Sequence, residues 1–534
     1  MPTKKEELNI WKDRIKKSID YRKKFLSDWN YWEQIYDNNL WATNKFGSRT
    51  AIPNPNSPVQ INELDTIVNT IIPRILYSYP IFDVEDMASG NTLSALIYEV
   101  FALKLYEVLD MYNTLREVVT DTLILGAGIH KTGMVFDVEM NEYRSDSGIY
   151  NEMPMSCYVQ PRNFLWDYRF DDWSQIRWMA EEIEKPLEEV IKSDLYTGVS
   201  KLKGNVSSLE YLPQQFNQNY KREDDVVRLI EVHDLVKGKI YTIVLDHPEF
   251  LQYDDDYGIC IYDALEFTKT RPKRMFGKSI SQDIEQHLVR LSLNNHWMDE
   301  DGKSAARRMY MVDNSIGKQA IQKIDSDEAR VLVPIDGLMG MSGDPIREIR
   351  TSNNVFQWQT TLGMVERQIR QLAGSTAADR GIHEAGVETA VEARMLQDSS
   401  ETRNKDRAML LSLYIQKIMS KMLMLSSAYM KPERVAELIG MPIQDAYMIE
   451  PFDNMKLTVK YGSTAIESRE IYKQKLIQVS QMFPDLVNRT GLMQKFMSTL
   501  GFGLKDQDMM LSQTPRPAEQ QTVVQKPETL VGGA

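Results

Sequence analysis

A chain of 534 residues is longer than one hydrophobic core usually serves, so we expect about two to four packed units. Hydrophobic residues make up 42% of it and charged residues 26%, which is typical of a soluble globular protein and excludes a fibrous or low-complexity chain. The net charge of −13 argues against a protein whose main task is to grip nucleic acid, because tight binding to phosphates needs many Lys and Arg contacts. The negative charge does not exclude a protein along which DNA slides without being bound tightly.

Cysteines and targeting segments add two further limits. Cys157 and Cys260 are the only cysteines, so we expect neither a disulfide framework nor a thiolate metal site, but two buried small residues in a reducing compartment. No apolar signal follows the basic N-terminus, and no stretch approaches the roughly 18 apolar residues that span a bilayer. The sequence therefore predicts a soluble protein made in the cytoplasm.

Helices are predicted for most of the first 120 residues. Residues 4–38 carry five aromatic residues at spacings of four, four, three and four, which places them on one helical face: Tyr21, Phe25, Trp29, Trp32 and Tyr36. We interpret this stripe as core packing rather than a ligand site. After a proline-rich arm at 48–58, the pattern predicts helices over 60–78 and 91–119.

A mixed, strand-rich region follows, from about 122 to 270. Its strongest signal is a hairpin in which Val226–Leu235 pairs with Ile240–Leu245 around the turn Lys237-Gly238-Lys239. Residues 200–222 are polar and rich in Asn, Gln and Ser, which indicates a loop.

Two helices separated by a compact insert are predicted next. Ser279 and Gln282 form a capping box ahead of Ile280, Ile284, Leu288 and Leu291, and we expect the helix to end near Met298, before an acidic, glycine-containing turn. Short strands and turns are expected from 299 to about 351. A second helix is then predicted over 353–373, capped by Gly374, with a heptad stripe made of Val355, Trp358, Leu362, Val365, Ile369 and Leu372. At 1.5 Å per residue this helix is roughly 30 Å long.

The last long pattern is a helix from about Glu384 to Met430, preceded by a loop at 374–383. Its middle, residues 397–407, holds no apolar residue, whereas the part from Met409 to Leu425 is apolar over a wide face. A helix whose pattern changes in this way passes between two environments. The final residues, from Gln513, contain three prolines and no periodicity, which predicts a tail without fixed structure.

Motifs of common enzymes are missing from the sequence. None of the six histidines stands in a metalloprotease pair, and no G-x-S-x-G elbow occurs. Gly128 and Gly133 have the spacing of a phosphate-binding loop, but Met134 stands where the lysine must be, so we predict a turn leading into a strand at 133–137. The acidic run Asp254-Asp255-Asp256 is predicted to be solvated. We expect no catalytic residues, no metal and no cofactor.

Three segments, taken in order, resemble the portal proteins of tailed bacteriophages. They are the glycine turn Leu125-Gly126-Ala127-Gly128, the run from Val159 to Asp167 with the pattern V-x-P-x-x-F-x-W-D, and Glu388-Thr389-Ala390-Val391-Glu392-Ala393, which is similar to the T-A-x-E-A start of a family helix. The resemblance covers about 120–465. It implies an α+β, predominantly helical portal-type fold with a wing, a helical stem, a small clip insert and a helical crown.

The same resemblance implies how the chain is divided. The wing would occupy 1–277, the stem helices 278–298 and 353–373, and the clip 299–352. A tunnel loop would follow at 374–388, a long helix returning to the wing at 389–429, a short helical crown at 430–512 and a disordered tail at 513–534. The polar tail leaves no room for the long helical barrel that some short-tailed phages add.

Function follows from the resemblance in the same way. It implies a structural subunit of a homo-oligomeric ring, usually of twelve copies, at one vertex of the virion capsid, through which double-stranded DNA is packaged and ejected. The implied partners are other copies of the chain, the large terminase, a head–tail adaptor and the major capsid protein, with no membrane. The alternatives are another ring-forming virion or scaffold protein without a DNA channel, and a helical interaction module with no DNA role.

Three groups of residues are the candidates for these roles. The stem seam between subunits is predicted to be the heptad stripe given above. Partner docking at the clip is assigned to Arg307, Arg308 and Lys318. Residues facing the DNA channel are predicted to be Arg380, His383, Glu384, Glu388 and Glu392. The three glutamates stand at i, i+4 and i+8, and a solvated helix face is the simpler explanation of that row.

Overall fold

The structure is a computed structural model of the chain. It describes residues 3–37, 61–87, 92–135, 153–193, 195–204, 226–269, 274–306, 308–313, 330–336, 346–349, 355–374, 390–440 and 449–460. These residues are mostly helical with several small sheets, so the predicted α+β class holds at this coarser level. All of them belong to one compact unit, Met1–Ala465.

The first helix, α1 (Lys4–Tyr36), confirms the helix predicted at the N-terminus, and Thr3 closes it with a capping box to Glu6. Trp29 and Trp32 of the aromatic stripe are buried in the main core, and Tyr21 and Phe25 pack against it. The interpretation of the stripe as core packing is therefore confirmed.

A five-stranded sheet lies against α1. Its strands run in the order β4-β5-β6-β7-β8, all antiparallel. Their bounds are β4 (Phe164–Trp166), β5 (Trp178–Pro186), β6 (Val226–Asp234), β7 (Lys239–Ile243) and β8 (Gln252–Asp255). The β6–β7 hairpin is the one predicted, and Gly238 supplies the positive φ of 62° that its turn requires.

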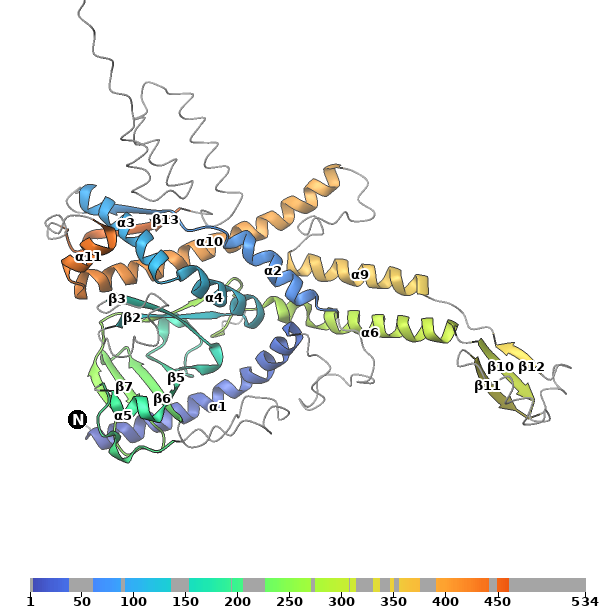
Figure 1. Ribbon diagram of the computed structural model, residues 1–534, viewed down its shortest axis with the longest axis horizontal. Helices are drawn as coiled ribbons and strands as arrows, with labels where there is room; N and C mark the ends of the chain where they lie inside the picture. Colours follow the sequence, from blue (N-terminus) through green and yellow to red (C-terminus); the bar gives the residue numbers. More distant parts are fainter. Residues whose placement is uncertain are drawn as a thin grey trace, which may run out of the picture. The chain divides into compact units, whose positions relative to one another are not determined.

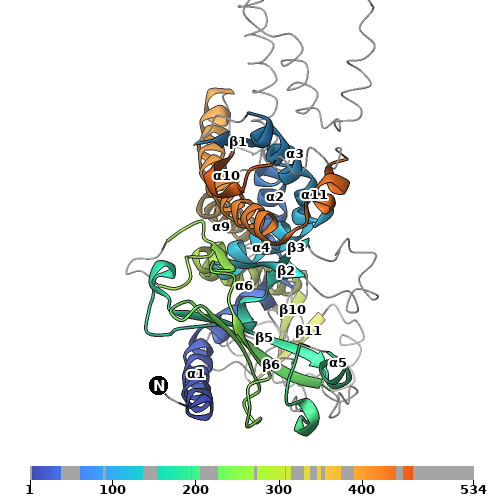
Figure 2. The same cartoon turned by 90° about the vertical axis from the view of Figure 1, so that its left-hand side faces the viewer.

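The two faces of this sheet are covered by different helices. Apolar residues of α1 pack with Ile230 and Val232, whereas Val227 and Leu229 pack with Val190 of the short helix α5 (Leu187–Lys192). Because side chains alternate along a strand, the two sets face opposite sides of β6. Figure 2 shows α1 and α5 on either side of β5 and β6.

A second sheet has the order β3-β2-β9, with β2 (Gly128–Val135) between β3 (Met153–Val159) and β9 (Tyr262–Leu265). The strand begins at Gly128, earlier than the 133–137 predicted. A Cβ added at Gly128 would overlap the carbonyl of Val118, and one at Gly126 would overlap that of Gly277. Backbones therefore approach closely at this turn, which explains its glycines without a phosphate ligand.

Helices form the centre of the main core. They are α2 (Glu63–Ile75), α3 (Thr92–Val108), α4 (Met111–Leu125) and α10 (Ala390–Tyr429), followed by α11 (Pro432–Ile439). The prediction of one helix over 91–119 is wrong: the chain turns between α3 and α4, where Asp110 takes a left-handed conformation with φ 49°. Asp tolerates this conformation better than most residues, and the turn lets both helices pack.

Two strands distant in sequence meet beside these helices. Strand β1 (Phe82–Asp86) pairs antiparallel with β13 (Met455–Val459), in a register that joins Val84 to Leu457. The second strand lies in the region predicted as a helical crown, 430–512. Of that region the structure describes one helix, α11, a 3-10 turn at Phe452–Asn454 and β13.

One described helical segment is long and apolar enough to cross a membrane by length and composition. It is Thr402–Tyr429 of α10, with a mean hydropathy of 1.3 in its most apolar window, of which 56% is buried in the protein. The prediction found no such stretch, because it counted uninterrupted apolar residues. Ile415, Ile418 and Met422 are fully buried here, so this helix lies in the protein core.

The remaining elements are two long helices, α6 (Ile280–Ala306) and α9 (Val355–Ala373), and the small sheet that stands between them in the sequence (Figure 1). Helix α6 packs along α9, and the sheet has the order β11-β10-β12. Its strands are β10 (Arg308–Asp313), β11 (Arg330–Ile335) and β12 (Ile346–Ile349); β10 is parallel to β11 and antiparallel to β12. The predicted succession of helix, strand-containing insert and heptad helix is confirmed.

Candidate functional site

Helix α6 begins where the sequence predicts and ends later. Ser279 caps it, its Oγ accepting from the amide of Gln282 at 3.0 Å, and Ile284, Leu288 and Leu291 are buried. The helix does not end near Met298 but continues to Ala306. The predicted stop is overridden by a tertiary contact: the indole Nε1 of Trp358 on α9 donates to Asp301 Oδ2 at 2.6 Å.

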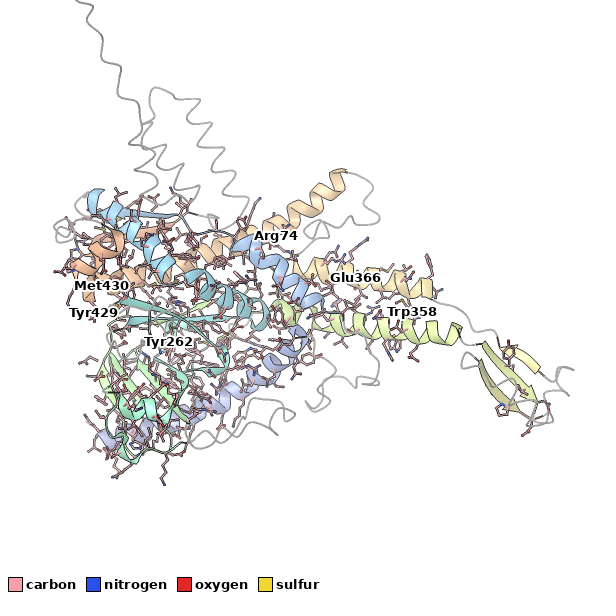
Figure 3. The ribbon with its side chains drawn as sticks, viewed as in Figure 1. Arg74, Tyr262, Trp358, Glu366, Tyr429 and Met430 are labelled. Carbon is pink, nitrogen blue, oxygen red and sulfur yellow. The ribbon has the colours of Figure 1, made fainter. Side chains whose placement is uncertain are left out.

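This contact also shows how the two helices are arranged. Trp297 and Trp358 meet with ring centroids 5.8 Å apart, near the end of α6 and the start of α9. At the other ends of the helices, Ile284 and Ile369 belong to the main core. The helices therefore run antiparallel as one hairpin, and the small sheet occupies the connection between them. Figure 3 places Trp358 and Glu366 on α9.

The predicted stem seam is only partly available to another subunit. Leu362, Val365 and Ile369 are buried within the single chain, in the same core cluster as residues of α6. For these three, the contact expected between subunits is a contact between two helices of one subunit. Trp358 is half-buried beside α6, Leu372 is 43% exposed, and the side chain of Val355 lies outside the described part.

A different apolar row on α9 is uncovered. Phe356 is 79% exposed, Met364 62% and Leu372 43%. These residues stand eight apart, so they belong to one i+4 row of the helix surface, the kind of ridge that packs into the groove of another helix. Large apolar side chains exposed together mark an interaction surface. The heptad analysis missed Phe356 and Met364 because it followed only the row that packs inside the subunit.

The C-terminal end of α9 is held by arginines of α10. The guanidinium of Arg403 donates to the carbonyl of Gln371 at 2.7 Å, and that of Arg407 donates to the carbonyl of Ala373 at 3.0 Å. The last carbonyls of a helix lack partners within it, and cations are favoured there. Burial, together with Arg403, lowers the pKa of Arg407 to about 10. Gly374 adopts the predicted left-handed cap, with φ 72°.

The arginine contacts account for part of the polar middle of the long helix. Sequence reasoning found that residues 397–407 hold no apolar residue and interpreted this as a change of environment. In the structure, Arg403 and Arg407 of this stretch hold the end of the neighbouring helix α9. An unbroken polar run gives no signal that separates two contacting arginines from a solvated surface.

Most candidate channel and clip residues lie outside what the structure describes. Arg380, His383, Glu384 and Glu388 are in the undescribed segment 375–389, and Glu392 is in α10 with no described side chain. Arg307 and Lys318 lie outside the described residues, and the side chain of Arg308 on β10 is likewise not described. Their assignment to the channel and to docking stays a prediction.

Buried ion pairs connect the sheets to each other and to the helices. Lys131 Nζ on β2 lies 2.9 Å from Glu231 Oε1 on β6 and 3.0 Å from Glu181 Oε2 on β5. Burial opposes the charged forms, but Lys131 and Glu231 face each other, so the pKa of Lys131 is raised and that of Glu231 is lowered. Arg22 of α1 pairs with Glu182 at 2.9 Å, and Lys421 of α10 pairs with Asp263 at 2.5 Å.

These pairs fix how the two sheets are oriented relative to each other and to α1 and α10. Among the described residues, no group of three or more His, Cys, Asp or Glu side chains is placed to hold a metal ion. Sequence analysis missed the pairs because each charge stands alone in its strand or helix and finds its partner only through the fold. Cys157 and Cys260, predicted to be buried, are half-buried thiols that form no disulfide.

Compared with known proteins, the chain matches no protein-family model and no curated protein.

Proposed function

We propose that this chain is a structural subunit of a homo-oligomeric portal ring, which forms the channel for double-stranded DNA at one capsid vertex. The observation that carries the proposal is the antiparallel pair α6–α9, connected through a small three-stranded sheet and anchored in the main core. Helix, insert and helix correspond to the stem and clip that the sequence resemblance implies. We assign the chain no catalytic role.

Ring formation is supported by what the single subunit leaves uncovered. Phe356 and Met364 expose most of their apolar surface on α9, and Trp297 is 44% exposed on α6. A ring repeats one contact between two different surfaces of neighbouring copies, and helices that stand side by side offer such surfaces. Burying these side chains between copies would remove apolar area from water, at about 25 cal/mol per Å².

The charge of the chain is compatible with a channel through which DNA slides. A net charge of −13 per subunit gives a ring that repels the DNA backbone overall. Each contact between a cation of the channel wall and a phosphate would strengthen DNA binding and slow the movement of the DNA. In this proposal the ring guides DNA and does not grip it.

The proposal is tested by the assembly state of the purified full chain. We expect size-exclusion chromatography with light scattering to give one large species, and negative-stain images to show rings with a central hole. Phe356→Asp and Met364→Asp should lower the ring fraction at least about tenfold while the circular dichroism of the subunit stays unchanged, because both side chains are exposed and only their contact with a neighbour is lost.

Gln359→Asp provides the matched control. Gln359 is exposed on α9 but lies off the apolar row, so the same charge is added without affecting the proposed contact. Rings that form equally well from the Phe356 and Met364 variants would refute this surface, and a chain that stays monomeric at all concentrations would refute the ring. Rings that assemble but neither bind large terminase nor pass DNA in a packaging reaction would instead support a virion ring without a DNA channel.

A further inference from the structure

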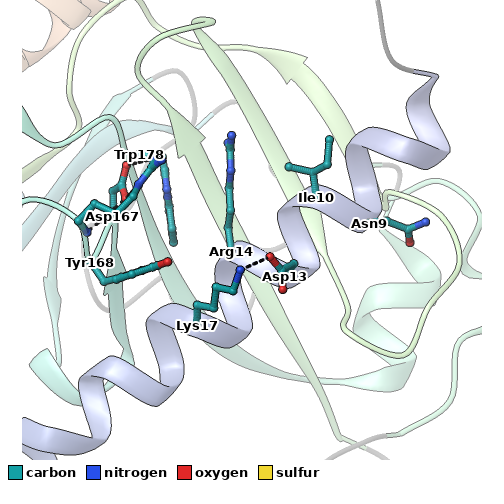
Figure 4. A pocket seen from close by; sticks show the side chains of 9 residues that line it. Asn9, Ile10, Asp13, Arg14, Lys17, Asp167, Tyr168 and Trp178 are labelled. Atoms are coloured by element: carbon teal, nitrogen blue, oxygen red, sulfur yellow. Dashed lines mark hydrogen bonds and ion pairs between the residues drawn. The ribbon is translucent and has the colours of Figure 1, made fainter.

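A pocket of about 450 Å³ lies between α1 and the segment that connects β4 to β5 (Figure 4). Its volume is in the range of sites for small ligands or single side chains. Six of its lining residues carry the chemistry: Asp13, Arg14, Lys17, Asp167, Arg169 and Trp178. None of them belongs to the stem or the clip.

Most charges in this pocket already have partners. Lys17 Nζ lies 2.7 Å from Asp13 Oδ2 on the next turn of α1. Arg169 holds Asp167 with two hydrogen bonds, of 2.7 Å from Nε and 2.6 Å from Nη2. Two cations and two carboxylates therefore neutralise each other, and one positive charge is left, that of Arg14.

Arg14 is half-buried and makes no ion pair among the residues that the structure describes. Its guanidinium lies over the ring of Trp11, 4.7 Å from the centroid. This contact leaves its in-plane N–H groups as donors, since the ring occupies only one face of the guanidinium. The pocket wall thus carries a cation whose hydrogen-bonding capacity is not used within the described part of the chain.

A second unused donor lies on the opposite side of the pocket. Trp178 is only 2% exposed, and its indole Nε1 has no hydrogen-bond partner among the described residues. A buried N–H without an acceptor costs about 1–3 kcal/mol, so proteins usually satisfy such groups. Figure 4 shows Trp178 and Arg14 bordering the same space. An acceptor placed there would lie beside Arg14 and beside the indole ring whose N–H has no partner among the described residues.

We propose that this pocket binds a carboxylate, which accepts hydrogen bonds from Arg14 and from the indole of Trp178. The residual charge of one favours a single negative charge. A phosphate dianion would bring a second charge that has no partner here and would face Asp13 and Asp167. The carboxylate comes either from an acidic side chain of a protein or from a small organic acid, and the experiment below distinguishes them. The proposal is independent of the portal ring.

The test is isothermal titration calorimetry on the full chain at constant ionic strength, with sodium acetate and inorganic phosphate as probes. Acetate should bind saturably and more tightly than phosphate. Arg14→Gln should weaken acetate binding about tenfold or more, because a charge-assisted hydrogen bond is lost. Trp178→Phe removes the indole N–H together with part of the buried ring system and should weaken acetate binding less than Arg14→Gln does. Lys16→Gln, which changes an exposed cation on α1 outside the pocket, should leave acetate binding unchanged.

Two further probes identify the source of the carboxylate. They are a blocked tripeptide, acetyl-Gly-Glu-Gly-amide, and succinate; tighter binding of the peptide than of succinate assigns a protein side chain, and the reverse order assigns a small acid. The glutamine version of the peptide should not bind. The proposal is overturned if acetate does not bind up to 100 mM, if phosphate binds more tightly than acetate, or if Arg14→Gln binds acetate like the unmodified chain. Because these readouts are binding constants, loss of ring assembly would not imitate any of them.

Discussion

Asp121 on α4 is a half-buried carboxyl group next to the sheet that contains β3. The hydroxyl of Tyr158 donates a hydrogen bond to its Oδ2, and Glu117 stands one turn earlier on the same helix. Burial raises the pKa of Asp121 to about 7, the bond from Tyr158 opposes this, and the charge of Glu117 adds to it. At pH values between its ordinary value of 3.8 and about 7, the folded protein therefore holds a proton that the unfolded chain has lost.

The sign of the resulting pH effect follows directly. A carboxyl group with a raised pKa in the folded state contributes stability at low pH, and this contribution is lost as the pH rises from about 4 to about 7. Asp121→Asn keeps the shape and removes the titration. We expect the melting temperature of the variant, relative to the unmodified chain, to rise steadily from pH 4.5 to pH 7.5 in differential scanning calorimetry.

Asp20→Asn is the control for this prediction, since Asp20 is an exposed carboxyl group on α1 and the substitution is the same. Its curve of melting temperature against pH should run parallel to that of the unmodified chain. A parallel curve for Asp121→Asn as well would mean that the carboxyl group of Asp121 titrates normally.

At the scale of elements, the contact between α9 and α10 has a measurable consequence. Arg407 is half-buried and donates to the carbonyl of Ala373 at the end of α9, so Arg407→Met keeps most of its packing but leaves that carbonyl without its cation, while Arg403 still holds Gln371. A hydrogen bond from a charged donor is worth about 1.5–3 kcal/mol. In hydrogen exchange measured by mass spectrometry, we expect amides of the last two turns of α9 to exchange at least about tenfold faster in the variant.

Lys405→Met is the matched control, because Lys405 lies exposed between the two arginines on α10. It should leave exchange in α9 unchanged. Equal protection of the last turns in all three proteins would show that packing against α6 alone holds this end of the helix.

Elements with strong periodicity were predictable from the sequence, and those decided by distant contacts were not. The aromatic stripe of α1 and the apolar spacing after Ser279 each report one buried helix face, so α1 and the start of α6 are where the patterns place them. The extension of α6 past Met298 depends on Trp358, more than fifty residues later. Local residues alone, with an acidic and glycine-containing stretch, indicate a stop.

In the candidate site, too, the local pattern was predictable and the partner of each residue was not. The heptad stripe on α9 correctly indicated a packed face, but the sequence does not say which chain provides the packing. In the structure α6 takes that face, and Phe356 and Met364 are left exposed, as the surface that we propose for another copy. An apolar residue at a non-core position of a helix pattern has no local feature that distinguishes an interface from a chance exposure.

At the scale of the whole molecule, the small sheet between α6 and α9 should be separable from the rest. Its three strands pair only with one another among the described residues, and the Asp301–Trp358 contact holds the two helices together just before it. Replacing residues 308–349 by a short Gly-Ser linker should leave ring assembly intact, as measured by mass photometry, and abolish binding to terminase and adaptor in pull-down assays.

The outcome distinguishes a docking module from a part of the core. Loss of folding after this replacement, detected by circular dichroism, would mean that the sheet supports the helix pair. Rings that still bind terminase would move the docking surface elsewhere on the subunit. A second variant with a linker of different length shows whether a loss of folding comes from strain in the linker rather than from loss of the sheet.

The pairing of β1 with β13 determines when the molecule can be completed during synthesis. Thr458 Oγ1 donates to the carbonyl of Asp83 across 375 residues of sequence, so β1 leaves the ribosome long before its partner strand exists. Closing so long a loop is slow, and until it closes the edge of β1 stays open. A nascent chain thus lacks this strand pair for most of translation, although the residues of α6 and α9 are already made. The core that includes β1 and β13 is therefore completed only after the residues of α6 and α9, which pack in the same core, have been made.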